Sequence, residues 1–433
     1  MTDFTSDAVR PPVNSTTAAV AASLGRRNRK QTIVKGLGLA AVAFAFLMLF
    51  ILVASLVATG WRAFTQTHIT LQVFVDPAAV PVERLPRGGF DDVLLAAVAA
   101  HLPDADLDDR ATRRSVAAIL SNGAQFALRD RVVADPSLIG RTITLKVPVS
   151  DPYDQLRKGL IDRDTPEANR RVSDAEIARF DALEAAGLIS APLNTALITN
   201  ADSRFPELAG LRGALVGSFW ALLVCFVISF PLGIGAAIYL EEFAPRNRMS
   251  DFIEVNINNL AAVPSVVFGL LALAVFLGWF GMPRSAPVVG GLTLALMTMP
   301  TIIIATRAAL KAVPPSIREA ALGVGASRQQ VVFHHVLPLA MPGILTGTII
   351  GLAQALGETA PLLLIGMNAF ITSAPSSPFE AATALPTQIF IWADSPERGF
   401  VSRTSAAILV LLTFLIAMNA IAIYLRSRFE RKW

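Results

Sequence analysis

Long stretches without a charged side chain are the feature of this sequence that most restricts its fold. A helix needs about 20 apolar residues to cross the hydrocarbon layer of a membrane, because its backbone groups must be hydrogen-bonded within the segment itself. Five stretches meet this condition without any Asp, Glu, Lys or Arg, and a sixth, residues 341–366, contains one carboxylate, Glu358. The five uncharged stretches are residues 36–61, 213–240, 255–283, 285–306 and 404–425.

The composition also favours a membrane protein. Hydrophobic residues make up 53% of the chain and charged residues only 16%, whereas soluble proteins carry about 25% charged residues. We therefore predict an all-α integral membrane protein with six transmembrane helices. The first stretch exceeds the apolar region of a cleaved signal peptide, which has about 7 to 15 residues, so we interpret it as an uncleaved anchor. Cys225 is the single cysteine and leaves no disulfide partner within one chain.

The positions of lysine and arginine indicate the orientation of the helices. Short segments rich in these residues stay in the cytoplasm. Six crossings then place both termini inside, together with residues 241–254 and 307–335, while the short loop around Arg284 faces out. The net charge of +4 follows from these flanking residues, and we expect no nucleic acid partner. The cytoplasmic basic residues are Arg26, Arg27, Arg29, Lys30, Lys35, Arg246, Arg248, Lys311, Arg318, Arg328, Arg426, Arg428, Arg431 and Lys432.

The hydropathy pattern divides the chain into five parts. Residues 1–35 form a basic cytoplasmic tail, expected to be disordered because it is polar and contains two prolines. Residues 36–61 are the anchor, and residues 62–211 form a periplasmic extension domain of ordinary soluble composition. Residues 212–425 contain the other five spans and a cytoplasmic loop at 314–338. Residues 426–433 form a second basic cytoplasmic tail.

Periodicity predicts a mixed α/β extension domain. Apolar residues alternate with others in residues 69–75 and 143–147, which is typical of half-buried strands. Residues 151–171, with two prolines and dense charge, are the expected mobile loop. The arginines of this domain could attract an oxyanion, but a solvated surface explains them better, and we predict no site there. Two helices are also expected, one capped by Asp91 and running to about Ala100, the other opened by a capping box of Ser173 and Glu176 and ended by Gly187.

The cytoplasmic loop at 314–338 has the pattern of two short helices joined by a turn. Ser316 and Glu319 have the spacing of a capping box, and Ser327 with Gln330 repeats it. Small side chains at Ala320 and Ala321 allow the first helix to lie closely in a groove of another protein, and Gly325 permits a sharp turn. The alternative is that Glu319 only caps its helix; both roles are compatible.

This loop resembles the Glu-Ala-Ala loop of permease subunits of ATP-binding-cassette importers. Glu319, Ala320, Ala321 and Gly325 match that motif, and Leu337 and Pro338 follow it, although His335 stands where the family has an apolar residue. The resemblance implies that the short helix docks on a separate cytoplasmic ATPase, which uses ATP and Mg. The chain itself contains no Gly-x4-Gly-Lys-Ser/Thr loop. We therefore predict a transporter subunit that is not an enzyme, with no catalytic residues and no cofactor of its own.

The carboxylate in residues 341–366, the fifth predicted span of the chain, is the second candidate site. Ionisable groups in the hydrocarbon region are costly and usually face the bundle interior or water, so Glu358 is a functional candidate. Pro361 removes a helix hydrogen bond, and the Thr359 hydroxyl can satisfy the freed carbonyl or meet a solute. Gln354 lies one turn away. Arg307 is a candidate cation for the path, although a positive-inside anchor explains it better. The alternative for Glu358 is a buried packing role.

Residues 357–363 (Gly-Glu-Thr-Ala-Pro-Leu-Leu) resemble the signature of phosphate-specific permeases of the PstA type, and residues 263–270 support this resemblance. Gln354 stands where that family often has an arginine. The resemblance implies a type I importer permease core in the bacterial inner membrane and phosphate import by alternating access. It also implies a second homologous permease, an ATPase dimer and a periplasmic phosphate-binding protein as partners.

Three other functions remain open at this stage. One is an importer permease for molybdate, sulfate or amino acids, which would keep the coupling loop. Another is a proton-coupled secondary transporter that uses Glu358 as its proton carrier and needs no ATPase. A membrane sensor is the least favoured, because the cytoplasmic segments are too short for a signalling domain. No metal site is expected, since adjacent His334 and His335 point about 100° apart on a helix.

Overall fold

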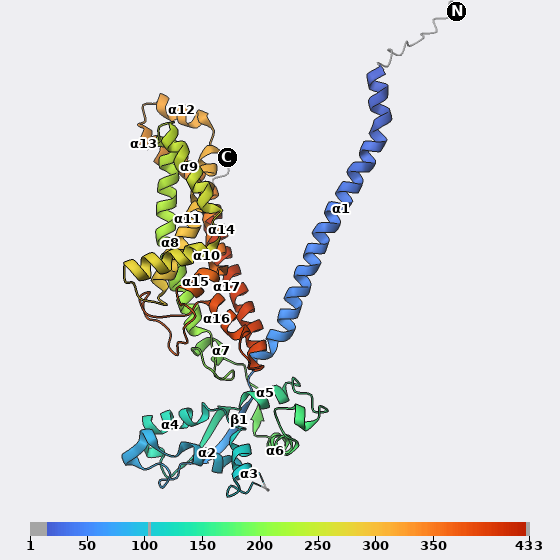
Figure 1. Ribbon diagram of the computed structural model, residues 1–433, viewed down its shortest axis with the longest axis vertical. Helices are drawn as coiled ribbons and strands as arrows, with labels where there is room; N and C mark the ends of the chain where they lie inside the picture. Colours follow the sequence, from blue (N-terminus) through green and yellow to red (C-terminus); the bar gives the residue numbers. More distant parts are fainter. Residues whose placement is uncertain (1–14, 103–104, 430–433) are drawn as a thin grey trace, which may run out of the picture. The chain divides into compact units, whose positions relative to one another are not determined.

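A computed structural model describes residues 15–102 and 105–429 of the chain (Figure 1). The chain divides into two units, one ending at Ala58 and the other beginning at Thr59. The first consists of helix α1 (Ser15–Gly60), which contains the predicted anchor. Residues 15–35 are therefore helical, and the prediction of a disordered tail is wrong for them; this segment contains no proline, so the helix of the anchor can extend through it. The rest of that tail and residues 430–433 lie outside the described residues.

Five helices of the described chain are long and apolar enough to cross a membrane, or six if one bent pair is counted as a single span. They confirm the predicted multi-span membrane protein. Besides α1 they are α8 (Arg212–Ile238), which continues in the π-helical turn η5 (Tyr239–Phe243), α11 (Pro287–Lys311), α14 (Leu337–Gly357) and α17 (Gly399–Phe429).

The third predicted span, residues 255–283, is broken. Helix α9 (Arg248–Ala261) and the segment formed by α10 (Ser265–Ala272) and η6 (Leu273–Trp279) meet at an angle of 100°. Pro264 causes the break, because it lacks an N–H group and disfavours helical geometry at the residue before it. The length of the run predicts a span, and the adjacent Pro264 and Ser265 were the sequence signal for a broken helix within it.

The span containing Glu358 is also interrupted. Helix α14 ends at Gly357, and Glu358 is extended with φ −77° and ψ 124°. A short helix α15 (Ala360–Leu364) follows, with Pro361 in its first turn. The two broken elements meet: a Cβ on Gly269 of α10 would lie 2.8 Å from the Cα of Pro361. The predicted continuous span 341–366 is therefore wrong at Glu358.

Small residues set the packing of α11 against α14. A Cβ on Gly347 would lie 2.1 Å from the Cβ of Ala305, and one on Gly343 would lie 2.7 Å from that of Ala309. Close approach of helix backbones through small residues is the usual way in which membrane helices associate. The two contacts fix the register: α11 and α14 are antiparallel, and Arg307 of α11 lies level with the α14 segment between the two glycines.

The extension domain contains a three-stranded antiparallel sheet in the order β2-β1-β3, formed by β1 (His68–Phe74), β2 (Thr142–Pro148) and β3 (Ile189–Ser190). Leu71 pairs with Leu145, and both are buried, as the alternation predicted. The sheet is accompanied by the 3-10 turn η1 (Trp61–Phe64) and by α2 (Phe90–Ala99), α3 (Arg110–Ala117), α4 (Ala124–Ala134), α5 (Asp151–Arg157), α6 (Asp174–Ala185) and α7 (Ala196–Thr199).

Three local predictions in this domain can be compared with the structure. The capping box of Ser173 and Glu176 opens α6, as predicted, and Gly187 follows the helix with φ +73°. Asp91 does not cap α2, because the helix begins at Phe90; its carboxylate lies instead in the first turn, where the helix dipole favours it. The mobile loop predicted for residues 151–171 is wrong at its start, since these residues form α5, and Pro152 suits the first turn of a helix.

The remaining elements connect the spans. Helix α12 (Pro315–Gly323), the single turn α13 (Arg328–Gln330) and the π-helical η7 (Val331–Val336) lie between α11 and α14. Helix α16 (Leu385–Ala393) precedes α17. Short 3-10 turns of the extension domain are η2 (Val82–Arg87), η3 (Pro136–Leu138) and η4 (Glu167–Asn169).

Candidate coupling loop and translocation path

The loop between α11 and α14 has the predicted helix, turn and helix. Gly325 turns the chain with φ +90°, a conformation that glycine adopts without strain. The capping box of Ser327 and Gln330 is formed: the Gln330 N–H donates to Ser327 Oγ over 3.3 Å, and the Ser327 N–H donates to Gln330 Oε1 over 2.8 Å. This second helix start is therefore confirmed.

The capping box predicted for Ser316 and Glu319 is wrong. Helix α12 begins at Pro315 after Pro314, and no side chain caps it. Pro315 lies in the first turn and has no backbone N–H, so the helix start has one donor fewer for a cap to satisfy. Glu319 is exposed and forms no hydrogen bond or ion pair with the described residues. Its alternative role as a helix cap is thus not observed.

The two alanines of α12 face different surroundings. Ala321 is buried in a hydrophobic cluster with Val313 and Val332, so its small size lets α12 approach the ends of the long helices. Ala320 is exposed, as are Ser316 and Gly325. Leu322 and Val324 beside them are 48% and 86% exposed. The loop thus has an anchored inner face and an outer face with uncovered apolar side chains.

Arg318 fastens α12 to two long helices. Its Nη2 donates to Glu242 Oε1 over 2.7 Å, and Glu242 belongs to the turn that ends α8. Arg318 also donates to the carbonyl oxygens of Val313 and Leu310 over 2.7 and 2.9 Å, so it caps the carbonyl end of α11. The sequence reading assigned Arg318 only to membrane orientation. The consecutive acids Glu241 and Glu242 beside a basic loop were the signal for this contact.

Arg307 forms a second set of ion pairs near the same end of the helices. Its Nη2 lies 2.8 Å from Glu254 Oε2 of α9, and its Nε lies 3.3 Å from Glu241 Oε2. Lys311 also approaches Glu241, at 3.6 Å. From the register of α11 and α14, Arg307 lies roughly 20 Å from Glu358 along the helix axis, at 1.5 Å per residue. The structure therefore does not bring these two candidate path residues together.

Glu358 lies at the helix interruption without a partner. Its side chain is half-buried, and its carboxylate forms no hydrogen bond or ion pair with the described residues. The Thr359 hydroxyl likewise has no hydrogen bond there, so it does not satisfy a freed carbonyl as expected; the Thr359 carbonyl accepts from the Leu363 N–H over 3.0 Å. Gln354 is exposed one turn earlier, while Pro361 is buried. This part of the chain is thus a short polar segment whose side chains have unused hydrogen-bonding groups, at Gln354, Glu358 and Thr359.

Within the described ranges, no three His, Cys, Asp or Glu side chains are arranged to hold a metal ion. The buried Cys225 lies 3.5 Å from the Thr298 hydroxyl at the contact between α8 and α11. These observations assign no chemistry beyond hydrogen bonding and charge to the interior of the helix bundle.

Comparison with known proteins finds one family whose match contains both the coupling loop and the Glu358 segment. Residues 229–432 match the family described as binding-protein-dependent transport system inner membrane component. The phosphate transport system permease protein PstA 1 of Mycobacterium tuberculosis (strain H37Rv) is 32% identical over 219 residues, which cover 50% of this chain and 70% of that protein. The chain belongs to this permease family. The predicted relationship to importer permeases of the PstA type is thereby confirmed.

The chain is also similar to other known proteins over about the same length. The phosphate transport system permease protein PstA of Yersinia pestis is 32% identical over 221 residues, covering 49% of the chain and 71% of that protein. A probable ABC transporter permease, YqgI of Bacillus subtilis (strain 168), is 29% identical over 245 residues, covering 53% and 82%. A solved structure of the MetNI methionine ABC transporter in an inward-facing conformation matches 51% of the chain and 97% of that chain, with 16% identity and a TM-score of 0.40.

The amino-terminal part of the permease matches a separate family. Residues 21–167 correspond to a domain of unknown function, DUF3333. This match includes α1 and the first two strands and ends before α6. An amino-terminal extension of this family is therefore present before the permease match.

Proposed function

We propose that this chain is a transmembrane permease subunit of an ABC importer that moves inorganic phosphate into the cytoplasm by alternating access. The observation that carries this proposal is the 32% identity to phosphate permeases within a family match that includes both the coupling loop and the Glu358 segment. A family match that extends over both places supports a shared way of coupling, and the identity to phosphate permeases supports a shared solute.

The coupling loop supports an ATPase partner. Its outer face combines the exposed apolar side chains Leu322 and Val324 with the free carboxylate of Glu319, and uncovered apolar groups of this kind mark contact surfaces. In this proposal an ATPase dimer binds that face and uses ATP and Mg. A second homologous permease completes a type I importer core, and a periplasmic binding protein delivers phosphate. Both termini lie in the cytoplasm of a bacterial cell, as the distribution of basic residues favours.

The Glu358 segment is the proposed point of contact with phosphate. An ionised carboxylate repels an anion, so Glu358 either takes a counter-charge from the second permease or acts as a neutral acid. As a neutral acid its hydroxyl donates a hydrogen bond to a phosphate oxygen, and Gln354 and Thr359 can donate others.

Uptake measurements test the solute. Deletion of the gene, in a strain without other phosphate transporters, should abolish high-affinity uptake of labelled phosphate, and the intact gene should restore it. Unchanged uptake would refute the proposal. Competition by molybdate, sulfate or amino acids at equal concentration distinguishes phosphate import from import of another solute by the same machinery.

A proton-coupled transporter is the second candidate, because an unpartnered carboxylate within a span is also suited to carry a proton. The two candidates differ in their energy source. An ABC importer should co-purify with an ATPase, and its uptake should stop when that ATPase is inactivated while the proton gradient is intact. Uptake that follows the proton gradient without an ATPase would favour the second candidate.

A further inference from the structure

Buried charges join the extension domain to the last span. Arg403, near the beginning of α17, is only 4% exposed. Its guanidinium donates to the carbonyl oxygen of Ala209 over 2.7 Å and to Gln66 Oε1 over 2.8 Å. Gln66 precedes β1, and Ala209 precedes α8. One side chain of α17 therefore holds two segments at the boundary between the extension domain and the membrane domain, and we call this region the joint.

Three buried carboxylates surround the joint: Asp151 and Asp154 of α5, and Glu207. Asp154 has a cation, since Lys158 Nζ lies 2.6 Å from its Oδ2, and its Oδ1 accepts the Thr67 N–H over 2.9 Å. Glu207 accepts from the Ser121 hydroxyl over 2.8 Å. Asp151 accepts only from Gln155, over 2.5 Å, and has no ion pair within the described residues.

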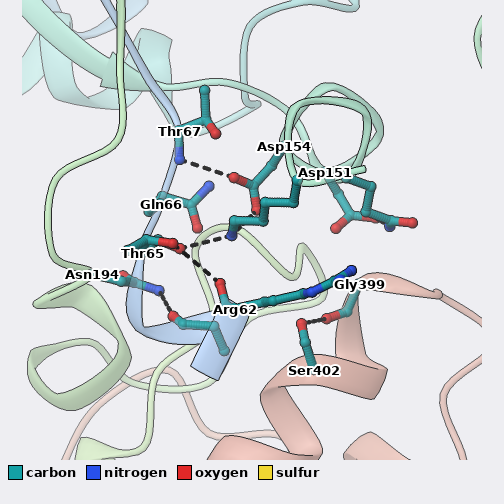
Figure 2. Close-up of polar contacts among 12 residues, drawn as sticks. Arg62, Thr65, Gln66, Thr67, Asp151, Asp154, Asn194, Gly399 and Ser402 are labelled. Atoms are coloured by element: carbon teal, nitrogen blue, oxygen red, sulfur yellow. Dashed lines mark hydrogen bonds and ion pairs between the residues drawn. The ribbon is translucent and has the colours of Figure 1, made fainter. Parts of the chain in front are cut away.

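Asp151 also touches the backbone of the last span directly. A Cβ built on Gly399, the first residue of α17, would lie 1.9 Å from Asp151 Oδ1. Only a glycine allows the carboxyl group to sit there. Figure 2 shows Asp151 and Asp154 on one side of this contact and the start of α17, with Gly399 and Ser402, on the other. The charge of Asp151 is therefore located at the contact surface itself.

Charged groups of several elements act on Asp151. They are Asp154 of α5, Lys158 directly after α5, Glu207 before α8 and Arg403 of α17. Burial, and next the repulsion from Glu207, raise the pKa of Asp151 to about 6 from an ordinary value of 3.8, against the opposing effects of Gln155 and Arg403. Burial also raises the pKa of Glu207. A carboxyl whose pKa is raised in the closed joint binds its proton more tightly there than when the joint is open.

The joint also contains polar atoms that remain unsatisfied. Gln66 Nε2, Thr67 Oγ1 and Thr404 Oγ1 are buried without a hydrogen-bond partner among the described residues. Buried polar groups without partners cost free energy in the closed state. This cost opposes closure and keeps opening of the joint accessible, so that a change of one charge can alter its population.

We propose that the joint between the extension domain and α17 is an acid-tightened latch, in which protonation of Asp151 strengthens the attachment of the extension domain to the last span. Above the titration range of Asp151, an unpaired negative charge is pressed against Gly399 beside Asp154 and Glu207, and the joint opens more often. Below that range Asp151 is neutral and the joint stays closed. This device concerns the extension domain and does not depend on which solute the permease carries.

Hydrogen exchange of the complete purified transporter in lipid nanodiscs tests the latch. Segments 62–67 and 399–404 report opening of the joint, and strand β1 with β2 serves as an internal control. Asp151→Asn has the shape of the neutral acid, and comparison with wild type at the same pH removes the intrinsic pH dependence of exchange. From the two pKa values, opening in wild type should increase about tenfold from pH 5.0 to pH 7.5 relative to Asp151→Asn.

Two further variants make the result specific. Asp130→Asn removes an exposed carboxylate of the same domain and should behave as wild type. Glu207→Gln removes the main repulsion and should move the midpoint of the wild-type transition to lower pH. The proposal is overturned if the ratio of wild type to Asp151→Asn is the same at both pH values, or if Asp151→Asn itself retains the transition. It is also overturned if Glu207→Gln leaves the midpoint unchanged.

Discussion

Replacement of Arg318 by alanine should detach the coupling helix α12 from the helix ends that it contacts. The substitution removes the ion pair with Glu242 and the hydrogen bonds to the carbonyl oxygens of Val313 and Leu310. It leaves Glu242, whose side chain is 11% exposed, without a counter-charge. Removing one partner of a fully buried pair costs about 3 to 5 kcal/mol. Because Arg318 is 23% exposed, water can reach the site, and we expect about 2 kcal/mol.

A loss of about 2 kcal/mol increases the population of the detached loop roughly 30-fold. Hydrogen exchange of α12 in the assembled transporter measures this change directly. If the chain is the proposed phosphate importer subunit, the same variant should hydrolyse more ATP per phosphate transported, because α12 is no longer fastened to α8 and α11. Arg318→Lys retains the charge but not the planar fork of donors, so it should give an intermediate value.

Arg328→Ala is the matched control, since Arg328 lies in the same loop and is exposed. A double-mutant cycle with Glu242→Gln should give a coupling energy of about 1 to 2 kcal/mol, as neighbouring groups in one network do. The reasoning fails if Arg318→Ala leaves both the exchange of α12 and the ratio of ATP to phosphate at wild-type values. It also fails if Arg328→Ala produces the same change.

Three other outcomes are expected. Glu358→Gln should retain most phosphate uptake and Glu358→Ala should lose about tenfold, as deletion of one hydrogen bond of about 1.4 kcal/mol implies; loss of uptake in the glutamine variant would show that the charge is required. Glu319→Ala should reduce co-purification of the ATPase without lowering the unfolding temperature, because Glu319 has no contact within the described chain, and normal co-purification would count against α12 as the docking element. Gly347→Leu should lower the unfolding temperature by overpacking against Ala305 at a cost of about 1 to 3 kcal/mol, whereas Gly357→Ala, which meets nothing within 4 Å, should have little effect through packing.

Most spans of the membrane domain could be predicted, because each one must by itself be long and apolar enough to cross the bilayer. Long apolar runs therefore indicate spans without knowledge of their neighbours. The interruptions at Pro264 and Glu358 were harder to predict, because proline within a membrane helix leads to a kink or to a full break, depending on tertiary contacts. The contact of Gly269 with Pro361 is such a tertiary contact, and single-sequence periodicity does not contain it.

The candidate sites, too, could be predicted only where their signal is local in the sequence. Glu358 and the alanines of α12 were recognised because their signal lies within a few residues. The failure at Ser316 has a local cause, since Pro315 starts the helix and makes the cap unnecessary. The joint was missed because Gln66, Ala209 and Arg403 are far apart in the sequence. Residues 151–157 were predicted to be a loop because their charges looked like solvent-exposed charges, whereas two of their carboxylates are buried at the joint.

The two interrupted spans give the membrane domain a pair of adjoining pivots. In an unbroken helix, a change of direction midway must stretch or break several backbone hydrogen bonds. In α9 and α10, and again in α14 and α15, the hydrogen-bond ladder already stops at the bend, so a change of direction there breaks fewer backbone hydrogen bonds. Since α10 and α15 touch at Gly269, the two weak points of the bundle lie side by side.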